Sequence, residues 1–405
     1  MKKTGVYVHI PFCSRKCVYC DFLSAPGSEE EITAYMRSLV KEIEQSSFQL
    51  SVKGEEVSSS KETEKRTDVF TEGSKQVDSV FIGGGTPSIV PAAYIEKTLE
   101  TIKSVFFVAQ DAEITIESNP GTLDLEKLRI YKKCGINRIS IGLQSARDAE
   151  LKLLGRIHGW NDFAKSFDMA RAVGFDNINV DIMQALPGQT IERYRETLER
   201  VGAIEPEHVS AYSLILEEGT KLYECIDEYP PVPDEDTERK MYYMTREFFE
   251  SRGYERYEIS NFAKKTDDDR YRCRHNLGYW DRAPYIGFGL GASSFDGKCR
   301  YANTSDMKTY LGRKCTEEIR VNVETLSKKD AMAEFIFLGL RKTEGVDDKI
   351  FCEKFGQTIG DVYGEVTDSL IKKELLSVTK KGYALTDRGV DISNVVLAEF
   401  LDQSR

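Results

Sequence analysis

The 405-residue sequence has no long apolar run and no feature of an exported protein. No segment approaches the 18 or more apolar residues of a membrane span, so we expect no transmembrane helix. The apolar stretch at 6–12 contains His9 and Pro11 and leads directly into Cys13, which does not fit a signal peptide. We therefore expect a cytoplasmic protein whose nine cysteines are thiols or metal ligands rather than disulfides.

An excess of basic charge is also absent. The chain has 56 Lys and Arg against 67 Asp and Glu, a net charge of -11, which repels a phosphate backbone unless a local basic patch outweighs it. Residues 325–405 contain 12 Lys and Arg against 14 Asp and Glu, a net charge of -2. The sequence therefore predicts no nucleic-acid partner.

Strand-like and helix-like segments alternate through the first half of the chain. The apolar pattern predicts strands at 5–10, 77–82, 113–118, 138–142, 177–183 and 208–213. Helical spacing occurs at 30–45, 91–105, 124–133, 162–173 and 191–203. Six β/α units in a row suggest a partial (β/α)6 TIM-type barrel as readily as an open doubly wound sheet, and periodicity alone does not choose between them.

The segments outside these repeats differ in composition. Residues 51–68 hold nine charged residues and two aliphatic ones, so we expect a mobile insertion at about 46–76 in the barrel domain, which spans 1–215. Three prolines between 230 and 233 mark a connecting region, which we place at 216–325. Helical spacing followed by a strand-turn-strand pattern at 376–385 predicts a winged-helix-like α+β domain at 326–405, suited to packing or protein contact.

Three cysteines follow the first predicted strand in the pattern Cys-x3-Cys-x2-Cys. They are Cys13, Cys17 and Cys20, and three thiolates in so short a loop predict a metal site. A structural zinc ion normally takes four protein ligands, whereas a 4Fe-4S cluster held by three cysteines leaves one iron open. Zinc would need His9 or a distant cysteine such as Cys273 as its fourth ligand.

This cysteine pattern, with the sequence Tyr-Val-His-Ile-Pro-Phe at 7–12 ahead of it, resembles the radical S-adenosylmethionine (SAM) enzymes. In that family the open iron chelates the amino and carboxylate groups of SAM. An electron from the cluster then cleaves SAM to a 5'-deoxyadenosyl radical. The resemblance implies a partial barrel for the six β/α units and an electron donor for the cluster.

Five loops after the predicted strands carry residues that could complete a SAM pocket, because ligands of parallel α/β folds bind at that edge. Gly84, Gly85 and Thr86 lie in a Gly-Gly-Gly-Thr-Pro segment, where glycines allow backbone groups to approach a ligand. By resemblance, this segment contacts the SAM amino group. The resemblance also places Tyr7 and Tyr19 at the SAM site.

Four further polar residues complete the expected SAM site. By resemblance, Glu117 belongs to the amino end of SAM, and Gln144 and Asp181 to the ribose or nearby polar groups. Arg156 can bind the SAM carboxylate with its planar guanidinium. Each residue taken singly is more often a surface or capping group, and their joint placement on successive loops favours a site.

The order of motifs along nearly the whole chain resembles one branch of the family, which holds oxygen-independent coproporphyrinogen III dehydrogenase and a haem chaperone. Phe22 stands where the dehydrogenase has a further cysteine, and six residues precede Tyr7 where the dehydrogenase has a long extension. His275 opens a His-Asn-x-x-Tyr-Trp segment associated with haem binding, which makes it the candidate haem ligand, with Tyr279 and Trp280 along the porphyrin face. A core turn with a hydrogen-bonded His is the alternative.

These features together predict a haem chaperone that carries a 4Fe-4S cluster and SAM and delivers haem to respiratory proteins. The dehydrogenase, which decarboxylates two propionates of coproporphyrinogen III, is the alternative. A radical SAM enzyme of RNA modification is more distant, and the acidic balance disfavours it. The catalytic residues and the oligomeric state, including a homodimer, are left open.

Overall fold

The structure is a computed structural model that describes residues 3–52 and 76–401. The predicted insertion at about 46–76 was drawn too wide, because helix α1 (Glu29–Val52) continues through its first residues and strand β2 (Gln76–Gly84) begins at its last. Residues 46–52 contain neither Gly nor Pro, so nothing in the sequence stops the helix there. The rest of the predicted insertion lies outside the described residues.

Six parallel strands lie side by side in the order in which the chain makes them. They are β1 (Lys3–Ile10), β2, β3 (Val108–Ser118), β4 (Arg138–Gln144), β5 (Ile178–Gln184) and β6 (His208–Ser213). A doubly wound sheet would reverse its strand order at a switch point, and this one does not. The predicted partial barrel of six β/α units is therefore confirmed.

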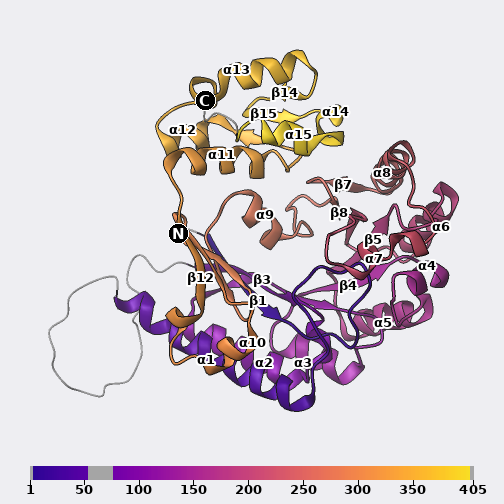
Figure 1. Cartoon of the computed structure of the whole chain (residues 1–405), viewed down its shortest axis with the longest axis vertical. Helices are drawn as coiled ribbons and strands as arrows, with labels where there is room; N and C mark the ends of the chain where they lie inside the picture. The colour runs from indigo at the N-terminus through magenta and orange to yellow at the C-terminus, as the bar shows by residue number, and fades with distance from the viewer. Residues whose placement is uncertain (1–2, 53–75, 402–405) are drawn as a thin grey trace.

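Helices cover the outer, convex face of this curved sheet (Figure 1). They are α1, α2 (Ala92–Val105), α3 (Leu125–Lys133), α4 (Asp148–Leu153), α5 (Trp160–Val173), α6 (Ile191–Ala203) and α8 (Glu235–Glu250). Alternation along each strand separates two environments. In β1, Val6 and Val8 are fully buried among the helices, whereas Tyr7 lines a cavity inside the barrel.

The predicted connecting region at 216–325 adds strands to both edges of the sheet. Strands β8 (Asn261–Lys264) and β7 (Tyr254–Arg256) continue beyond β6, and β9 (Tyr285–Phe288) pairs in parallel with β1. Strands β10 (Ser293–Phe295), β11 (Cys299–Asn303) and β12 (Arg320–Thr325) extend that second edge. The same region forms the short helices α7 (Lys221–Glu224), α9 (Arg274–Trp280) and α10 (Met307–Gly312).

A second, smaller core follows at the C-terminus and has the predicted winged-helix-like character. Its helices are α11 (Lys328–Gly339), α12 (Asp348–Phe355), α13 (Ile359–Lys372), α14 (Asp387–Asp391) and α15 (Ser393–Ala398). Strands β13 (Val346–Asp347), β15 (Gly382–Leu385) and β14 (Leu376–Val378) form an antiparallel sheet in that spatial order. The domain boundaries at 215 and 325 stay predictions.

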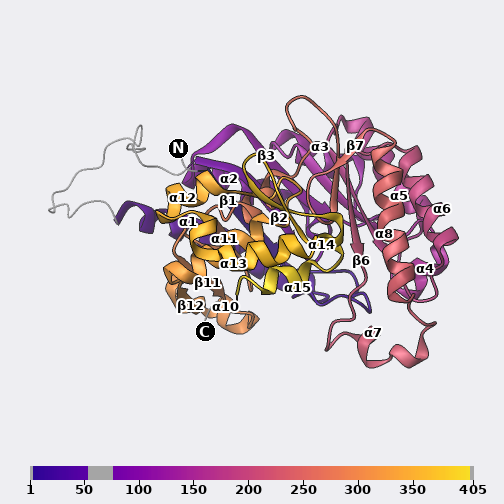
Figure 2. The same ribbon diagram turned by 90° about the horizontal axis from the view of Figure 1, so that it is seen from above.

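The C-terminal helices lie across the concave side of the barrel, next to α9 (Figures 1 and 2). The Arg282 guanidinium donates to Glu334 of α11 at 2.8 Å, and both side chains are buried. On the other side, the Tyr243 hydroxyl of α8 donates to Asp391 of α14 at 2.7 Å. No helix in the described part of the chain is both long and apolar enough to cross a membrane.

Candidate cofactor site

The three cysteines lie in the loop that follows β1, at the carboxyl end of the barrel strands. The backbone amides of Gly85 and Thr86 donate to the carbonyls of Ile10 and Phe12 at 2.8 and 2.7 Å, which fixes this loop against the end of β2. A Cβ atom at Gly85 would lie 2.6 Å from the Phe12 carbonyl oxygen and 3.0 Å from Cys13 Sγ. Glycine, which has no side chain, leaves room for the protein's own cysteine loop, whereas the sequence predicted only that the glycines leave room for a ligand.

A chain of polar contacts joins two of the cysteines across three loops. Thr86 Oγ1 lies 3.4 Å from Cys13 Sγ and accepts from Asn119 Nδ2 at 2.7 Å. Arg156 Nη2 donates to Asn119 Oδ1 at 2.7 Å, and its Nη1 donates to Cys17 Sγ at 3.7 Å. Asn119 was not among the predicted site residues, although it stands two positions after Glu117 in the Glu-Ser-Asn-Pro motif.

The cysteine loop does not form a complete zinc site among the residues that the structure describes. In the described residues, no group of three or more His, Cys, Asp or Glu is gathered tightly enough for one metal ion. A zinc ion draws its ligands to one centre, whereas each cysteine of a cluster binds a different iron. Both candidates for a fourth zinc ligand are engaged elsewhere: His9 bonds to Tyr7 and the Leu23 carbonyl, and the Cys273 thiol donates to Glu113.

Arg156 has a free donor that suits a ligand carboxylate. Its Nη2 also donates to the Gly142 carbonyl, but its buried Nε has no hydrogen-bond partner in the structure. A buried donor without a partner is costly, so this atom marks a place where a ligand acceptor would fit. Tyr19 lies beside Arg156 and packs against Leu154, and burial raises its pKa far above the ordinary value.

Glu117 ends β3 next to the glycine segment. Its Oε2 accepts from the Gly84 amide at 3.1 Å, and Gly84 has φ 115°, which favours glycine. A Cβ atom at Gly83 would lie 2.7 Å from the same oxygen. Burial, followed by the nearby Asp181 carboxylate, raises the Glu117 pKa to about 8. A cationic ligand group would therefore shift this carboxyl group toward its ionised form.

Gln144 ends β4, and Asp181 lies in the middle of β5. Gln144 has φ 72°, a left-handed conformation that is uncommon for residues other than glycine and that often occurs at functional sites. Asp181 is turned into the barrel, where it accepts from Ser140 Oγ at 3.0 Å and Asn179 Nδ2 at 2.7 Å. Burial raises the Asp181 pKa above the ordinary value.

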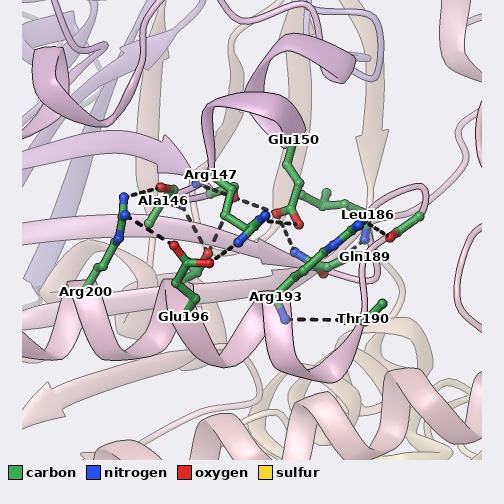
Figure 3. Close-up of polar contacts among 12 residues, drawn as sticks. Ala146, Arg147, Glu150, Leu186, Gln189, Thr190, Arg193, Glu196 and Arg200 are labelled. Atoms are coloured by element: carbon green, nitrogen blue, oxygen red, sulfur yellow. Dashed lines mark hydrogen bonds and ion pairs between the residues drawn. The ribbon is translucent and has the colours of Figure 1, made fainter.

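The loops after β4 and β5 are held from behind by the network in Figure 3. Buried Glu150 accepts from Gln189 Nε2 at 3.0 Å, which joins the two loops. Arg200 of α6 donates to the Ala146 carbonyl at 2.8 Å, and Arg147 pairs with Glu196 of the same helix. This network joins the loops after β4 and β5 to each other and to helix α6.

His275, the candidate haem ligand, lies at the other end of the barrel. The Glu113 carboxylate accepts from the amides of Arg274 and His275 at 3.0 and 3.2 Å, which positions α9 across the amino ends of the strands. The ring Nδ1 lies 3.0 Å from Ser79 Oγ, and Nε2 lies 3.0 Å from the Tyr279 hydroxyl. Burial lowers the His275 pKa to about 3, so the imidazole is neutral at physiological pH.

The two aromatic residues of the His-Asn-x-x-Tyr-Trp segment face different neighbours. The Tyr279 ring lies edge-on to Tyr285, with 4.7 Å between centroids. Trp280 packs under the guanidinium of Arg341 in the C-terminal domain, 4.3 Å from the ring centroid. The two rings point in different directions, because consecutive residues of a helix point about 100° apart, and their place along a porphyrin face stays a prediction.

Two cavities meet at His275 and Tyr279. One, of about 180 Å³, lies inside the barrel and reaches from Glu117 and Asp181 down to α9. The other, of about 170 Å³, lies on the outer side of α9 beside Tyr285. Because His275 and Tyr279 line both cavities, they form the partition between the barrel interior and the outer cavity.

The partial barrel, the cysteine loop and the polar residues around it define a radical SAM protein. Comparison with protein families agrees, since residues 7–201 match the Radical SAM superfamily and residues 326–392 match the HemN C-terminal domain. Over 99% of this chain and 98% of the relative, the sequence is 34% identical to "Heme chaperone HemW" of Lactococcus lactis. It is 32% identical to "Heme chaperone HemW" of Bacillus subtilis over 98% of this chain and 99% of the relative. The chain belongs to the HemW family of radical SAM proteins.

A solved structure shows the same fold at lower sequence identity. Coproporphyrinogen III oxidase (HemN) from Escherichia coli, described as a radical SAM enzyme, superposes with a TM-score of 0.80. The match covers 98% of this chain and 90% of that one at 21% identity, so it supports the architecture alone.

Proposed function

We propose that this protein is a cytoplasmic haem chaperone that binds haem and passes it to haem-requiring respiratory proteins. The full-length similarity to curated heme chaperones, at 34% and 32% identity, carries this proposal. The dehydrogenase alternative has weaker support, since the similarity to the oxidase structure is 21%. Phe22, where the dehydrogenase has a cysteine, is exposed beside the cluster loop and has no sulfur to offer.

We assign a 4Fe-4S cluster to Cys13, Cys17 and Cys20, and SAM to the residues around Arg156 and Glu117. A bound cluster would supply an open iron for SAM and an electron from an external donor. The protein's own residues hold the ligands in place: Thr86 and Arg156 each contact a cysteine sulfur, and Arg156 Nε remains free for a carboxylate.

Haem ligation by His275 requires a rearrangement of α9. The neutral imidazole is in the correct state to bind iron, but both of its nitrogens already have partners. Neither adjoining cavity, at about 180 and 170 Å³, approaches the 300–1,000 Å³ of typical drug-sized ligand pockets. We infer that the Tyr279 hydroxyl leaves Nε2 when haem binds there.

Spectroscopic titration tests this function. Haem added to the anaerobically reconstituted protein should give a shifted Soret band, and His275→Ala should change that spectrum if the imidazole is an axial ligand. His158→Ala is the matched control, because His158 is also buried and neutral, with its pKa lowered to about 4. Transfer of the haem to an apo-respiratory haem protein completes the test. Absence of haem binding, or SAM-dependent release of carbon dioxide from coproporphyrinogen III over many turnovers, would reject the chaperone.

A further inference from the structure

The barrel cavity contains a buried arginine without a partner. Arg138 is the first residue of β4, and its side chain lines the cavity on the same face of the strand as Ser140. It is 2% exposed, and its Nε has no hydrogen-bond partner. No salt bridge to its guanidinium occurs among the residues that the structure describes. No motif in the sequence includes this residue.

Glu113 and Asp181, two carboxylates whose charges act on Arg138, already accept hydrogen bonds from other donors. Glu113 accepts from the amides of Arg274 and His275 and from the Cys273 thiol. Asp181 accepts from Ser140 and Asn179. Both carboxylates influence Arg138 through the cavity, but neither lies within ion-pair distance of it. A buried guanidinium without a bound acceptor is costly, so the cavity suits a ligand that brings one.

The chemistry of the cavity indicates a singly charged, planar acceptor. Arg138 is the one cationic side chain among the described residues that line it, since His275 is neutral. A dianionic phosphate would face the carboxyl groups of Glu117 and Asp181 with a single countercharge, whereas a carboxylate carries one negative charge and matches one guanidinium with two parallel hydrogen bonds. Asn276 and Ser210 also line the cavity and have side chains that can hydrogen-bond to the same ligand.

The size and the opening of the cavity limit what enters it. Its volume of about 180 Å³ suits a small molecule or one arm of a larger one. Tyr212, which lines the cavity at the end of β6, is 42% exposed. The cavity is therefore reached from the carboxyl end of the barrel, on the side of the cysteine loop.

We propose that the barrel cavity is a carboxylate-binding subsite with Arg138 as its anchor. Where the proposed haem function holds, a haem propionate is one source of this carboxylate, and a free small monocarboxylate is the other. The proposal that the cavity binds a carboxylate does not depend on which source is used.

The first experiment uses sodium propionate and the full-length, reconstituted protein. At equal ionic strength, propionate should raise the melting temperature above that in sodium chloride, and Arg138→Gln should abolish the difference. Arg129→Gln is the matched control, because it removes one positive charge from the exposed surface of α3. Without propionate, Arg138→Gln should lose little stability, because the guanidinium makes no hydrogen bond or ion pair with the residues that the structure describes. A large loss of stability would show a structural guanidinium and overturn the proposal.

The second experiment compares haem with haem dimethyl ester, in which both propionates are esterified. If the haem propionate is the source, the ester should bind the wild type about tenfold or more weakly, and Arg138→Gln should bind both equally. If propionate raises the melting temperature but the wild type binds haem and haem dimethyl ester equally well, the subsite binds a free carboxylate. A failure of both experiments overturns the subsite. Absence of all haem binding rejects the proposed function, while the propionate response still decides the subsite.

Discussion

Replacement of Arg156 tests the SAM site most directly, because the structure gives this side chain three kinds of contact. Its Nη2 donates to Asn119 and to the Gly142 carbonyl, its Nη1 donates to Cys17, and its Nε is left without a partner. If Nε and its charge serve the SAM carboxylate, Arg156→Ala removes a charge-assisted hydrogen bond worth about 1.5–3 kcal/mol. This corresponds to SAM binding about 10- to 150-fold weaker.

The cluster should survive this substitution. The 3.7 Å contact to Cys17 is long, and the thiolate would be held by iron, so iron content should stay within the error of the wild type. Arg156→Lys keeps the charge but loses the planar fork, so its SAM affinity should lie between those of the wild type and Arg156→Ala. Arg129→Ala is a matched control, because it removes an arginine from the exposed surface of α3.

The assay is calorimetric titration of SAM into anaerobically reconstituted protein, with iron and sulfide counted in the same samples. Unchanged SAM affinity in Arg156→Ala would refute the assignment of Arg156 to the ligand. Loss of iron in that variant, with iron retained in Arg129→Ala, would show that Arg156 supports the cluster through Cys17.

Three further predictions concern the same barrel. Asn119→Ala, which removes the acceptor of Arg156 and the donor to Thr86, should weaken SAM binding about tenfold by calorimetry, and an unchanged affinity would exclude the polar chain from the site. Glu117 has a folded pKa of about 8 against an ordinary value of 4.5, so the folded state holds its proton more tightly and unfolding free energy should fall between pH 4.5 and 8. In denaturant melts, the unfolding free energy of Glu117→Gln should fall less over this pH range than that of the wild type, and an equal fall in both proteins would contradict this assignment. Calorimetry in buffers of different ionisation enthalpy should also show that SAM binding at pH 7 releases protons. Removal of residues 326–405 should leave iron content and SAM affinity within about twofold, since the proposed ligands all precede Met183, and cluster loss would show that the C-terminal domain supports the barrel.

The sequence by itself determined the repeats and the cysteine loop. Apolar alternation marks a strand whatever its neighbours are, because one face of each barrel strand packs against helices. The spacing of Cys13, Cys17 and Cys20 is a local property of one loop. The motif residues that follow the strands were also readable, since the carboxyl ends of parallel strands share one edge.

The tertiary structure decided the partners of each side chain, which depend on segments far apart in the chain. Asn119 joins Thr86 to Arg156 only because three loops meet, and the placement of His275 depends on Glu113, 162 residues earlier. The sequence predicts the end of α1 too early, at 45, because the charged stretch at 51–68 suggests a loop. Residues 46–52 contain no helix breaker, and the helix continues through them. Arg138 reads in sequence as one charge at the start of a strand. Only the folded barrel reveals that its guanidinium is buried in a cavity and has no partner, because neither burial nor pairing is a local property.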